Sequence, residues 1–149
     1  MQNSLVMQLG RICRLYRGMM HARWDEIGLY RGQPFVLGVL WEREGITHSE
    51  LAAQMHVSPA TVTNTLKRME KAGFVERRHD LEDQRVSRVY LTDVGRAIRK
   101  QVEQHWQAVE AQVFGALSEQ ERETLSRLLE RVREKLVRLH EGRAGGTPL

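Results

Sequence analysis

The spacing of apolar side chains in the first third of the chain predicts two helices of different character. After a turn bracketed by Gly28 and Gly32, Pro34 opens a helix that carries almost no charge before Glu42, and we expect it to be central in the core. The helix before that turn has apolar residues in steps of three and four, which is typical of an amphipathic helix with one buried stripe. The stripe comprises Leu5, Leu9, Ile12, Tyr16, Met20, Trp24 and Ile27.

Two short capped helices are predicted in the centre of the chain. Thr47 and Glu50 form a T-x-x-E capping box, in which each side chain accepts a hydrogen bond from the backbone N–H of the other residue. Ser58 is placed to cap the next helix, Pro59 suits its first turn and Gly73 suits its end. Two helices joined in this way are typical of a helix-turn-helix.

A hairpin is predicted directly after this helix pair. Residues 74–78 and 87–91 favour strands and enclose a polar tip at residues 79–85. A helix-turn-helix followed by such a hairpin forms a winged helix. We therefore expect a mainly α fold with a small β-hairpin.

Two more amphipathic helices are expected toward the end of the chain. One begins at Thr92 or Asp93, and the other begins at a second capping box formed by Ser118 and Glu121. Their apolar positions are Ile98, Val102, Trp106, Val109, Val113 and Leu117 in one helix and Leu125, Leu128, Leu129, Val132, Leu136 and Leu139 in the other. The stripes at both ends of the chain are too long for one small core to cover. An intramolecular bundle could bury them, but two subunits do so more easily.

These elements divide the chain into four predicted parts. Residues 1–32 form an N-terminal dimerisation helix, and residues 33–92 form the winged helix-turn-helix. Residues 93–141 supply C-terminal dimerisation helices, and residues 142–149 form a flexible tail.

Composition and charge fit a folded protein that contacts nucleic acid. The 149 residues are 41% hydrophobic and 28% charged, with a formal net charge of +4 and a pI near 9.6. A modest basic excess suits a nucleic-acid partner without proving one. No apolar run approaches the roughly 18 residues that a membrane span needs. The N-terminus also lacks a signal-peptide pattern, so a cytoplasmic location with no membrane partner is expected.

The chain offers few residues for catalysis or metal binding. Its single cysteine, Cys13, excludes an intrachain disulfide and a thiolate cluster. The six histidines have no paired ligand spacing, so we expect no metal site. No nucleophile–base arrangement or phosphate loop occurs either. We therefore expect a protein that is not an enzyme and carries no cofactor.

The helix after Ser58 has separate core and outer faces. At 100° per residue, Leu66 and Met69 fall within about 40° of Val62, so these three anchor the helix. The outer face combines small, hydroxyl, amide and cationic side chains, which suit the base edges of a major groove. Base contacts concentrate near the N-terminal end of such a helix. We assign Ala60, Thr61, Thr63 and Asn64 to base edges, and Lys67 and Arg68 to the DNA backbone or a guanine. The alternative is a solvated helix face, which the attached hairpin disfavours.

The hairpin tip predicts a second DNA contact. Arg85 lies at the tip, where an arginine can enter a narrow minor groove. Asp83, two residues earlier, could hold the guanidinium in one orientation through a bidentate pair. Arg88 lies on a flanking strand, and we count it among the DNA-binding residues. The alternative is a hydrophilic loop that keeps the hairpin soluble.

Two stretches resemble the MarR family of bacterial transcriptional regulators. The string D-L-E-D-Q-R-V-S-R-V-Y-L-T-D-V-G at residues 80–95 is similar to the wing signature of that family. The preceding L-x-x-x-M-x-V-S-P-A-T-V-T-x-x-L-K-R-M-E-K-A-G-F-V-E-R is similar to its recognition-helix region. The order of elements over residues 4–140 also matches the family's plan, although the ends match only in architecture.

This resemblance implies a homodimer that binds a pseudo-palindromic operator in double-stranded DNA, with regulation as a repressor. The recognition positions carried over are Ser58, Ala60, Thr61, Thr63, Asn64, Lys67 and Arg68, and on the wing Asp83 orients Arg85. The dimer interface implied by the N- and C-terminal helices includes Leu5, Leu9, Ile12, Val113, Leu117, Leu125, Leu129, Val132 and Leu136.

The resemblance also implies release from DNA by a small phenolic or carboxylate effector. A mixed aromatic and cationic wall would suit an aromatic anion, and the candidate residues are Arg14, Arg17, His21, Trp24 and Phe35. The alternative is that the aromatic residues belong to the core and the arginines extend to water.

Cys13 invites comparison with peroxide-sensing members of the family. Because it leans toward the apolar stripe, a small buried hydrophobe is the favoured interpretation, and a redox sensor is the alternative. Two alternative functions of the protein remain open. One is a ligand-independent or architectural DNA-binding protein, and the other is a protein-interaction module that uses the same fold.

Overall fold

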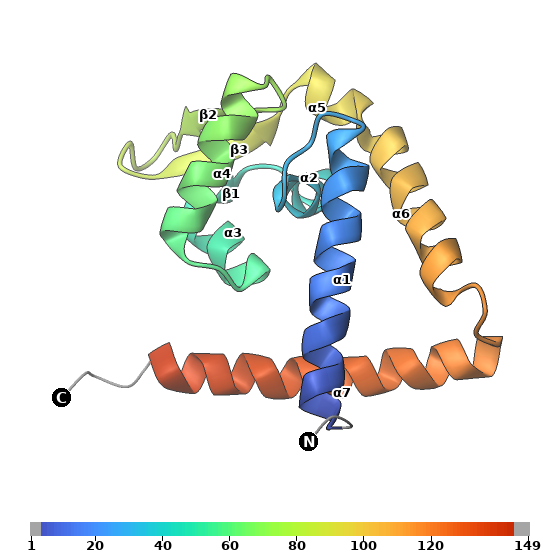
Figure 1. Ribbon diagram of the computed structural model, residues 1–149. Coiled ribbons are helices and arrows are strands. Elements are labelled where there is room, and N and C mark those ends of the chain that lie inside the picture. Colours follow the sequence, from blue (N-terminus) through green and yellow to red (C-terminus); the bar gives the residue numbers. More distant parts are fainter. Residues whose placement is uncertain (1–3, 145–149) are drawn as a thin grey trace. The chain divides into compact units, whose positions relative to one another are not determined.

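Residues 4–144 are described in the computed structural model, which is mainly helical with a small antiparallel sheet, as predicted (Figure 1). The helices are α1 (Leu5–Asp25), α2 (Gln33–Glu42), α3 (His48–Met55), α4 (Pro59–Lys71), α5 (Asp93–Ala97), α6 (Arg99–Phe114) and α7 (Glu119–Ala144). The strands are β1 (Ile46–Thr47), β2 (Val75–His79) and β3 (Ser87–Leu91). The chain forms two compact units that divide after His105, within α6.

The core of the first unit is built around α2, the uncharged helix. Val36, Leu37 and Leu40 are almost completely buried, as the sequence predicts. The neighbouring elements complete this core with Met20, Trp24, Leu29, Leu51, Val62, Leu66, Met69, Val75, Val89 and Leu91. Because α4 turns its three apolar residues inward, its polar residues remain at the surface.

The predicted caps of the helix-turn-helix are present. Glu50 N donates to Thr47 Oγ1 at 3.2 Å, and Thr47 N donates to Glu50 Oε2 at 2.9 Å, which closes the capping box of α3. His56 then adopts the left-handed conformation with a φ of 53°. This conformation ends α3 and turns the chain into α4, whose N-cap is Ser58.

The sheet contains one strand that the sequence analysis missed. The hairpin pairs β2 with β3, and Val75 faces Leu91 in the register. On the other edge of β3, the short strand β1 pairs Ile46 with Val89 and gives the order β1-β3-β2. A two-residue strand has no periodicity to detect, and its partner lies far along the chain.

The C-terminal helices differ from the prediction in two details. The expected helix from Thr92 is divided at Ile98 into α5 and α6. The second capping box is confirmed, with Ser118 N donating to Glu121 Oε2 at 2.8 Å. Helix α7 continues to Ala144, so the first three residues of the expected tail are helical. Residues 145–149 of that tail lie outside the described residues.

The long apolar stripes are largely exposed in the single chain. In α1 Met20 and Trp24 are the buried residues, so burial of the rest of the stripe by a second subunit stays a prediction. Leu5 and Ile12 are 81% and 61% exposed. Of the other residues expected at a dimer interface, Val113, Leu129, Val132 and Leu136 are exposed, and Leu9, Leu117 and Leu125 are half-buried.

Candidate nucleic-acid interface

Helix α4 begins with a network of short hydroxyl side chains. Thr61 N donates to Ser58 Oγ at 3.2 Å, and the two hydroxyl oxygens lie 2.8 Å apart. Thr63 Oγ1 donates to the carbonyl oxygen of Pro59 at 3.0 Å. These bonds hold the hydroxyl groups in fixed directions at the start of the helix, where base contacts are expected.

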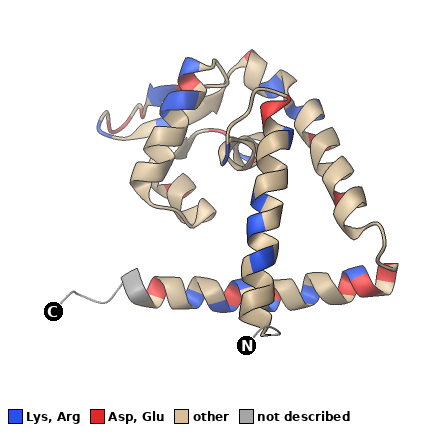
Figure 2. Cartoon of the chain, in the orientation of Figure 1, with Lys and Arg blue, Asp and Glu red and all other residues tan. Residues whose placement is uncertain are grey.

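The outer side of α4 carries every residue that the sequence analysis assigned to this helix. All of them are exposed, from the N-cap onward: Ser58, Ala60, Thr61, Thr63, Asn64, Lys67 and Arg68. Figure 2 shows basic residues on α4 and on the adjoining strands of the hairpin. This arrangement gives one helix face with hydrogen-bonding groups and positive charge.

Asp80 organises the tip of the wing from inside, a role that the sequence analysis missed. Its Oδ1 accepts the backbone N–H groups of Glu82 at 2.8 Å and Asp83 at 3.0 Å. Its Oδ2 accepts a short hydrogen bond from Arg88 Nε. Together the Arg88 guanidinium and the two N–H groups lower the pKa of Asp80 from 3.8 to about 2. An aspartate followed by a polar turn is the local signal that could have revealed this bond pattern.

Arg85 extends into solvent beside the acid that was expected to orient it. Its Nε lies 3.3 Å from Asp83 Oδ1, and its backbone N donates to the same oxygen at 3.0 Å. Because the pair uses one carboxylate oxygen, the bidentate geometry that we expected is wrong. The guanidinium side chain is 93% exposed and therefore accessible to a ligand.

Arg88 has two partners within the protein. Its Nη1 donates to the carbonyl oxygen of Gly45 at 2.8 Å, and its Nε is bound to Asp80. Its side chain is only 34% exposed. The guanidinium of Arg88 connects the wing to the loop between α2 and β1, and its assignment to DNA stays a prediction.

Ion pairs also hold the base of the hairpin against α4. Arg77 Nη2 lies 2.5 Å from Glu70 Oε2, which links β2 to α4. His48 lies at the start of α3. Burial is the main cause that lowers the pKa of His48, and the positive charge of Arg77 lowers it further. Arg78 pairs with Glu76, and its guanidinium carbon lies 4.4 Å from the centre of the Tyr90 ring. The strand arginines therefore have structural partners.

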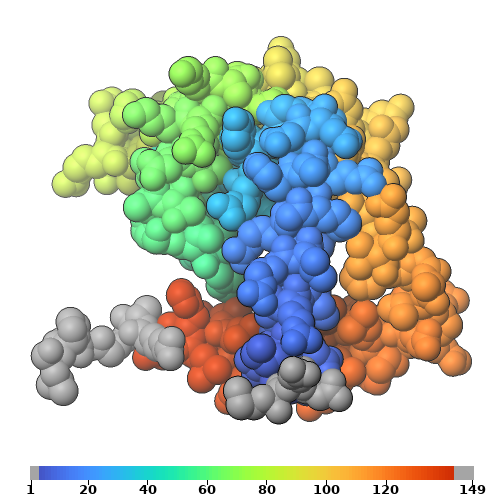
Figure 3. Space-filling model, in the orientation of Figure 1, coloured from blue at the N-terminus to red at the C-terminus, as the bar shows by residue number. Residues whose placement is uncertain are grey.

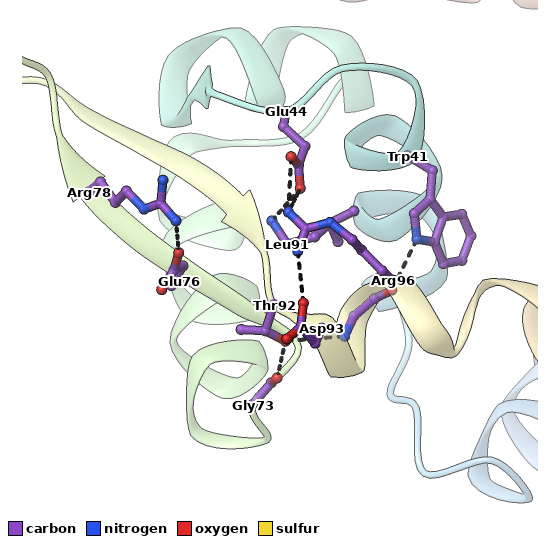
Figure 4. A network of polar contacts seen from close by, with 10 residues as sticks. Trp41, Glu44, Gly73, Glu76, Arg78, Leu91, Thr92, Asp93 and Arg96 are labelled. Atoms are coloured by element: carbon purple, nitrogen blue, oxygen red, sulfur yellow. Dashed lines mark hydrogen bonds and ion pairs between the residues drawn. The ribbon is translucent and has the colours of Figure 1, made fainter.

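A polar network fixes the end of β3 to α5 (Figure 4). Glu44 Oε1 accepts both the backbone N–H of Leu91 and Arg96 Nη2, each at 2.9 Å. Trp41 Nε1 donates to the carbonyl oxygen of Gly95 at 3.0 Å. Thr92 Oγ1 also donates to the carbonyl oxygen of Gly73 in the same view. This network ties the wing to the helix that continues toward the C-terminus.

Four of the five predicted effector-pocket residues, Arg17, His21, Trp24 and Phe35, line one cavity, and Arg14 lines the neighbouring cleft. Arg14, Arg17 and His21 line a cleft of about 660 Å³ between α1 and α4. Trp24 and Phe35 line a smaller cavity of about 270 Å³, which shares Arg17, His21 and Arg31 with the cleft. A single pocket with all five residues is therefore not present.

Cys13 lies at the surface. The favoured expectation that it is a small buried hydrophobe is wrong, because the residue is exposed. Its position on α1 also places it in the wall of the smaller cavity, beside Tyr16 and Arg17.

Residues 4–144 show neither a membrane-spanning helix nor a cluster of metal ligands. Within this range, no helix combines the length and apolar character needed to cross a lipid bilayer. The same residues contain no cluster of three or more His, Cys, Asp or Glu side chains suited to holding a metal ion.

Comparisons with known proteins agree with this geometry. Residues 29–87 match the model of the MarR family. The HTH-type transcriptional regulator YybA of Bacillus subtilis is 24% identical over 136 residues, which cover 91% of each chain. The crystal structure of the transcriptional regulator SlyA has a TM-score of 0.86 at 26% identity, over 93% of this chain and 98% of that one.

A solved DNA complex has the same fold. It is a putative MarR family transcriptional regulator from Listeria monocytogenes in complex with a 26mer DNA. Its TM-score is 0.86 at 18% identity, and the alignment covers 99% of each chain.

Proposed function

We propose that this chain, whose residues 29–87 match the model of the MarR family, is a DNA-binding transcriptional regulator that acts as a homodimeric repressor on a pseudo-palindromic operator. The observation that carries this proposal is the pairing of an exposed polar face on α4 with a stiffened wing that presents Arg85. A recognition helix and a wing arginine held in one arrangement suit duplex DNA. The helix occupies the major groove and the arginine enters the minor groove. Because the proposed partner is operator DNA, we also propose a cytoplasmic site of action.

In this proposal α4 reads bases and the wing adds affinity. Ala60, Thr61, Thr63 and Asn64 lie in the first half of α4 and contact base edges. Lys67 and Arg68, one or two turns later, neutralise phosphates or contact a guanine. On the wing, Asp83 limits the directions that the Arg85 guanidinium can take, which lowers the entropy cost of inserting it into the groove.

The homodimer is supported by the exposed apolar residues of α1 and α7. An exposed row of large aliphatic side chains is unfavourable in water and marks an association surface. A two-fold pair also matches the symmetry of a palindromic site, because each subunit then meets one half-site. We propose residues 1–32 and 93–141 as the dimerisation parts that flank the DNA-binding part at 33–92.

We also propose that a small aromatic anion regulates DNA binding from the cavity of about 270 Å³. Trp24 and Phe35 offer aromatic surface there, and Arg17 supplies a cation for a carboxylate. Salicylate is the first probe. A loss of operator affinity with salicylate supports this regulation, whereas no response to any phenolic acid favours the ligand-independent alternative.

The test of DNA reading starts from selection of duplexes that bind the protein from a random pool. Fluorescence anisotropy then compares the selected duplex with a shuffled one for the wild type, Asn64→Ala and the control Gln104→Ala, an exposed residue on α6. We expect Asn64→Ala to lose about 1–3 kcal/mol of discrimination, and Gln104→Ala to retain it. Equal losses on both duplexes would show that Asn64 does not read bases. Binding without salt dependence would favour a protein-interaction module.

The exposure of Cys13 favours a second candidate function, a hydroperoxide sensor. The thiolate of Cys13 would attack the O–O bond of an organic hydroperoxide, giving a sulfenic acid and an alcohol. Cumene hydroperoxide should then release operator DNA from the wild type and not from Cys13→Ser, with a mass increase of one oxygen on Cys13. Release from both proteins, or no oxidation, rejects this candidate.

A further inference from the structure

The imidazole of His79, at the end of strand β2, is held by one ring nitrogen and leaves the other open. Its Nδ1 lies 3.0 Å from the carbonyl oxygen of Gln84 in the wing turn. A carbonyl oxygen only accepts hydrogen bonds, so Nδ1 carries the proton. The other nitrogen, Nε2, has no hydrogen-bond partner within residues 4–144. Because the residue is exposed, Nε2 is accessible to a ligand.

The bond to Gln84 is one of several that fix the shape of the wing turn. Asp80 N donates to the carbonyl oxygen of Val86 at 2.9 Å, and Val86 N donates to that of Asp83 at 2.9 Å. Figure 3 shows the yellow-green tip of the hairpin projecting from the edge of the first unit. The imidazole is therefore held beside a turn that projects toward any surface the wing meets.

The wing tip carries more negative than positive side chains. Residues 79–88 contain three carboxylates and two guanidinium groups, so their formal charge is −1 while the imidazole is neutral. Two of the carboxylates are paired: Asp80 with Arg88 and Asp83 with Arg85. The third, on Glu82, forms no ion pair among the described residues. A proton on His79 brings the formal charge of the tip to zero, which reduces its repulsion from phosphate.

The groups around the imidazole leave it without an acidic partner. The residue opposite His79 on β3 is Ser87, which is uncharged. Arg78, the preceding residue on β2, pairs with Glu76 and lies against the ring of Tyr90. His79 itself forms no ion pair in the part of the chain that the structure describes. An anion outside the protein would therefore be the counter-charge of the protonated ring.

We propose that His79 Nε2 donates a hydrogen bond to a DNA phosphate and takes up a proton from solvent as it does so, which makes operator affinity depend on pH. The neutral imidazole already uses its one N–H group on Gln84, so Nε2 becomes a donor only in the charged form. The negative charge of phosphate favours the charged form of an imidazole beside it. The contact rests on the proposed DNA binding of the wing and gives that binding a pH response.

The first experiment measures affinity for the selected duplex at about pH 5.5 and about pH 8, at constant ionic strength. Fluorescence anisotropy compares the wild type, His79→Gln and the control His140→Gln, an exposed histidine of α7. At the lower pH the wild type and the control should bind about tenfold more tightly than His79→Gln, because they gain a hydrogen bond to a charged group. At the higher pH all three should bind alike. The same pH response in the wild type and His79→Gln would overturn the proposal, and so would an equal loss in His79→Gln at both pH values.

The salt dependence separates a phosphate contact from a change in the shape of the wing. One phosphate contact changes the slope of log affinity against log salt concentration by about one. The slope of the wild type should therefore be steeper at the lower pH than at the higher, and that of His79→Gln should not change. His79→Arg, which is charged at both pH values, should have the steeper slope at both. A wild-type slope that is the same at both pH values would exclude the phosphate contact.

Calorimetry in two buffers of different ionisation enthalpy measures the protons directly. At about pH 6.5 the wild type should take up more protons on binding the duplex than His79→Gln does. Equal uptake by the two proteins would overturn the proton-linked contact alone, and the proposed function would stand. Absence of duplex binding by the wild type at every pH would instead overturn the proposed function, together with the contact that rests on it.

Discussion

Arg88 Nη1 donates a hydrogen bond of 2.8 Å to the carbonyl oxygen of Gly45, 43 residues earlier in the chain. The same guanidinium binds Asp80, whose other oxygen holds two backbone N–H groups of the wing turn. Arg88 thus connects the loop after α2 to the tip of the hairpin. We expect this internal connection to fix the wing turn from which Arg85 projects.

Asp80→Asn should loosen the wing tip, because the neutral amide accepts the Arg88 bond more weakly than a carboxylate does. The folded pKa of about 2 lies below the ordinary 3.8. The stabilisation is therefore complete above about pH 4 and is lost as the pH falls toward 2. Hydrogen exchange of the Glu82 and Asp83 amides should be faster in the variant at pH 7, and the difference should shrink as the pH falls toward 2. Glu82→Gln, the same change on an exposed neighbour, is the control; an equal effect of both variants contradicts the role of Asp80.

Arg85→Ala should weaken operator binding by about 1–3 kcal/mol, since it removes a groove contact at the wing tip. The fold should be unaffected, because the side chain is 93% exposed and its one bond among the described residues is to Asp83. Anisotropy at matched salt measures the loss, with Gln84→Ala at the neighbouring exposed position as the control. Unchanged affinity of Arg85→Ala would remove the minor-groove contact.

Gly95→Ala should destabilise the first unit by roughly 1–3 kcal/mol through overpacking. A Cβ at Gly95 would lie 2.1 Å from the carbonyl oxygen of Phe74, so the backbone must shift. Gly10→Ala in α1 has nothing within 4 Å of the added carbon and should be neutral or stabilise the helix by roughly 0.5–1 kcal/mol. Urea unfolding measures both variants. Equal stability of Gly95→Ala and the wild type would show that the contact with Phe74 relaxes without cost.

Leu129→Asp should disrupt the dimer, because it places a charge in an apolar interface at a cost of several kcal/mol. In a single chain the same change is mild, since Leu129 is already 46% exposed. Sedimentation equilibrium should therefore show a folded monomer. Arg127→Asp lies about 160° around α7 from Leu129 and serves as the control that keeps the dimer. A dimer of undiminished stability in Leu129→Asp would exclude this interface.

The local sequence pattern was enough to predict which face of α4 is buried and which is exposed. Capping boxes at Thr47 and Ser118 and the three inward residues of α4 depend on neighbours within one helical turn. Their positions in the sequence therefore determine their positions in the structure. The hairpin followed from the same kind of local pattern, to within one residue at the start of β2.

Tertiary structure decided which individual side chains are buried and which partners they bond. Arg88 resembles other wing arginines in the sequence, and only the approach of Gly45 gives it a structural role. Cys13 lies next to the apolar stripe of α1 in the sequence pattern. No element of its own chain covers it enough to bury it. Four arginines line one cleft because α1, the following loop and α4 meet in space; they are Arg14, Arg17, Arg31 and Arg68. The sequence by itself determined helices, caps and the outer face of α4, since these depend on short-range bonds. Burial, partners and cavities required the fold, since they depend on contacts between residues far apart in the chain.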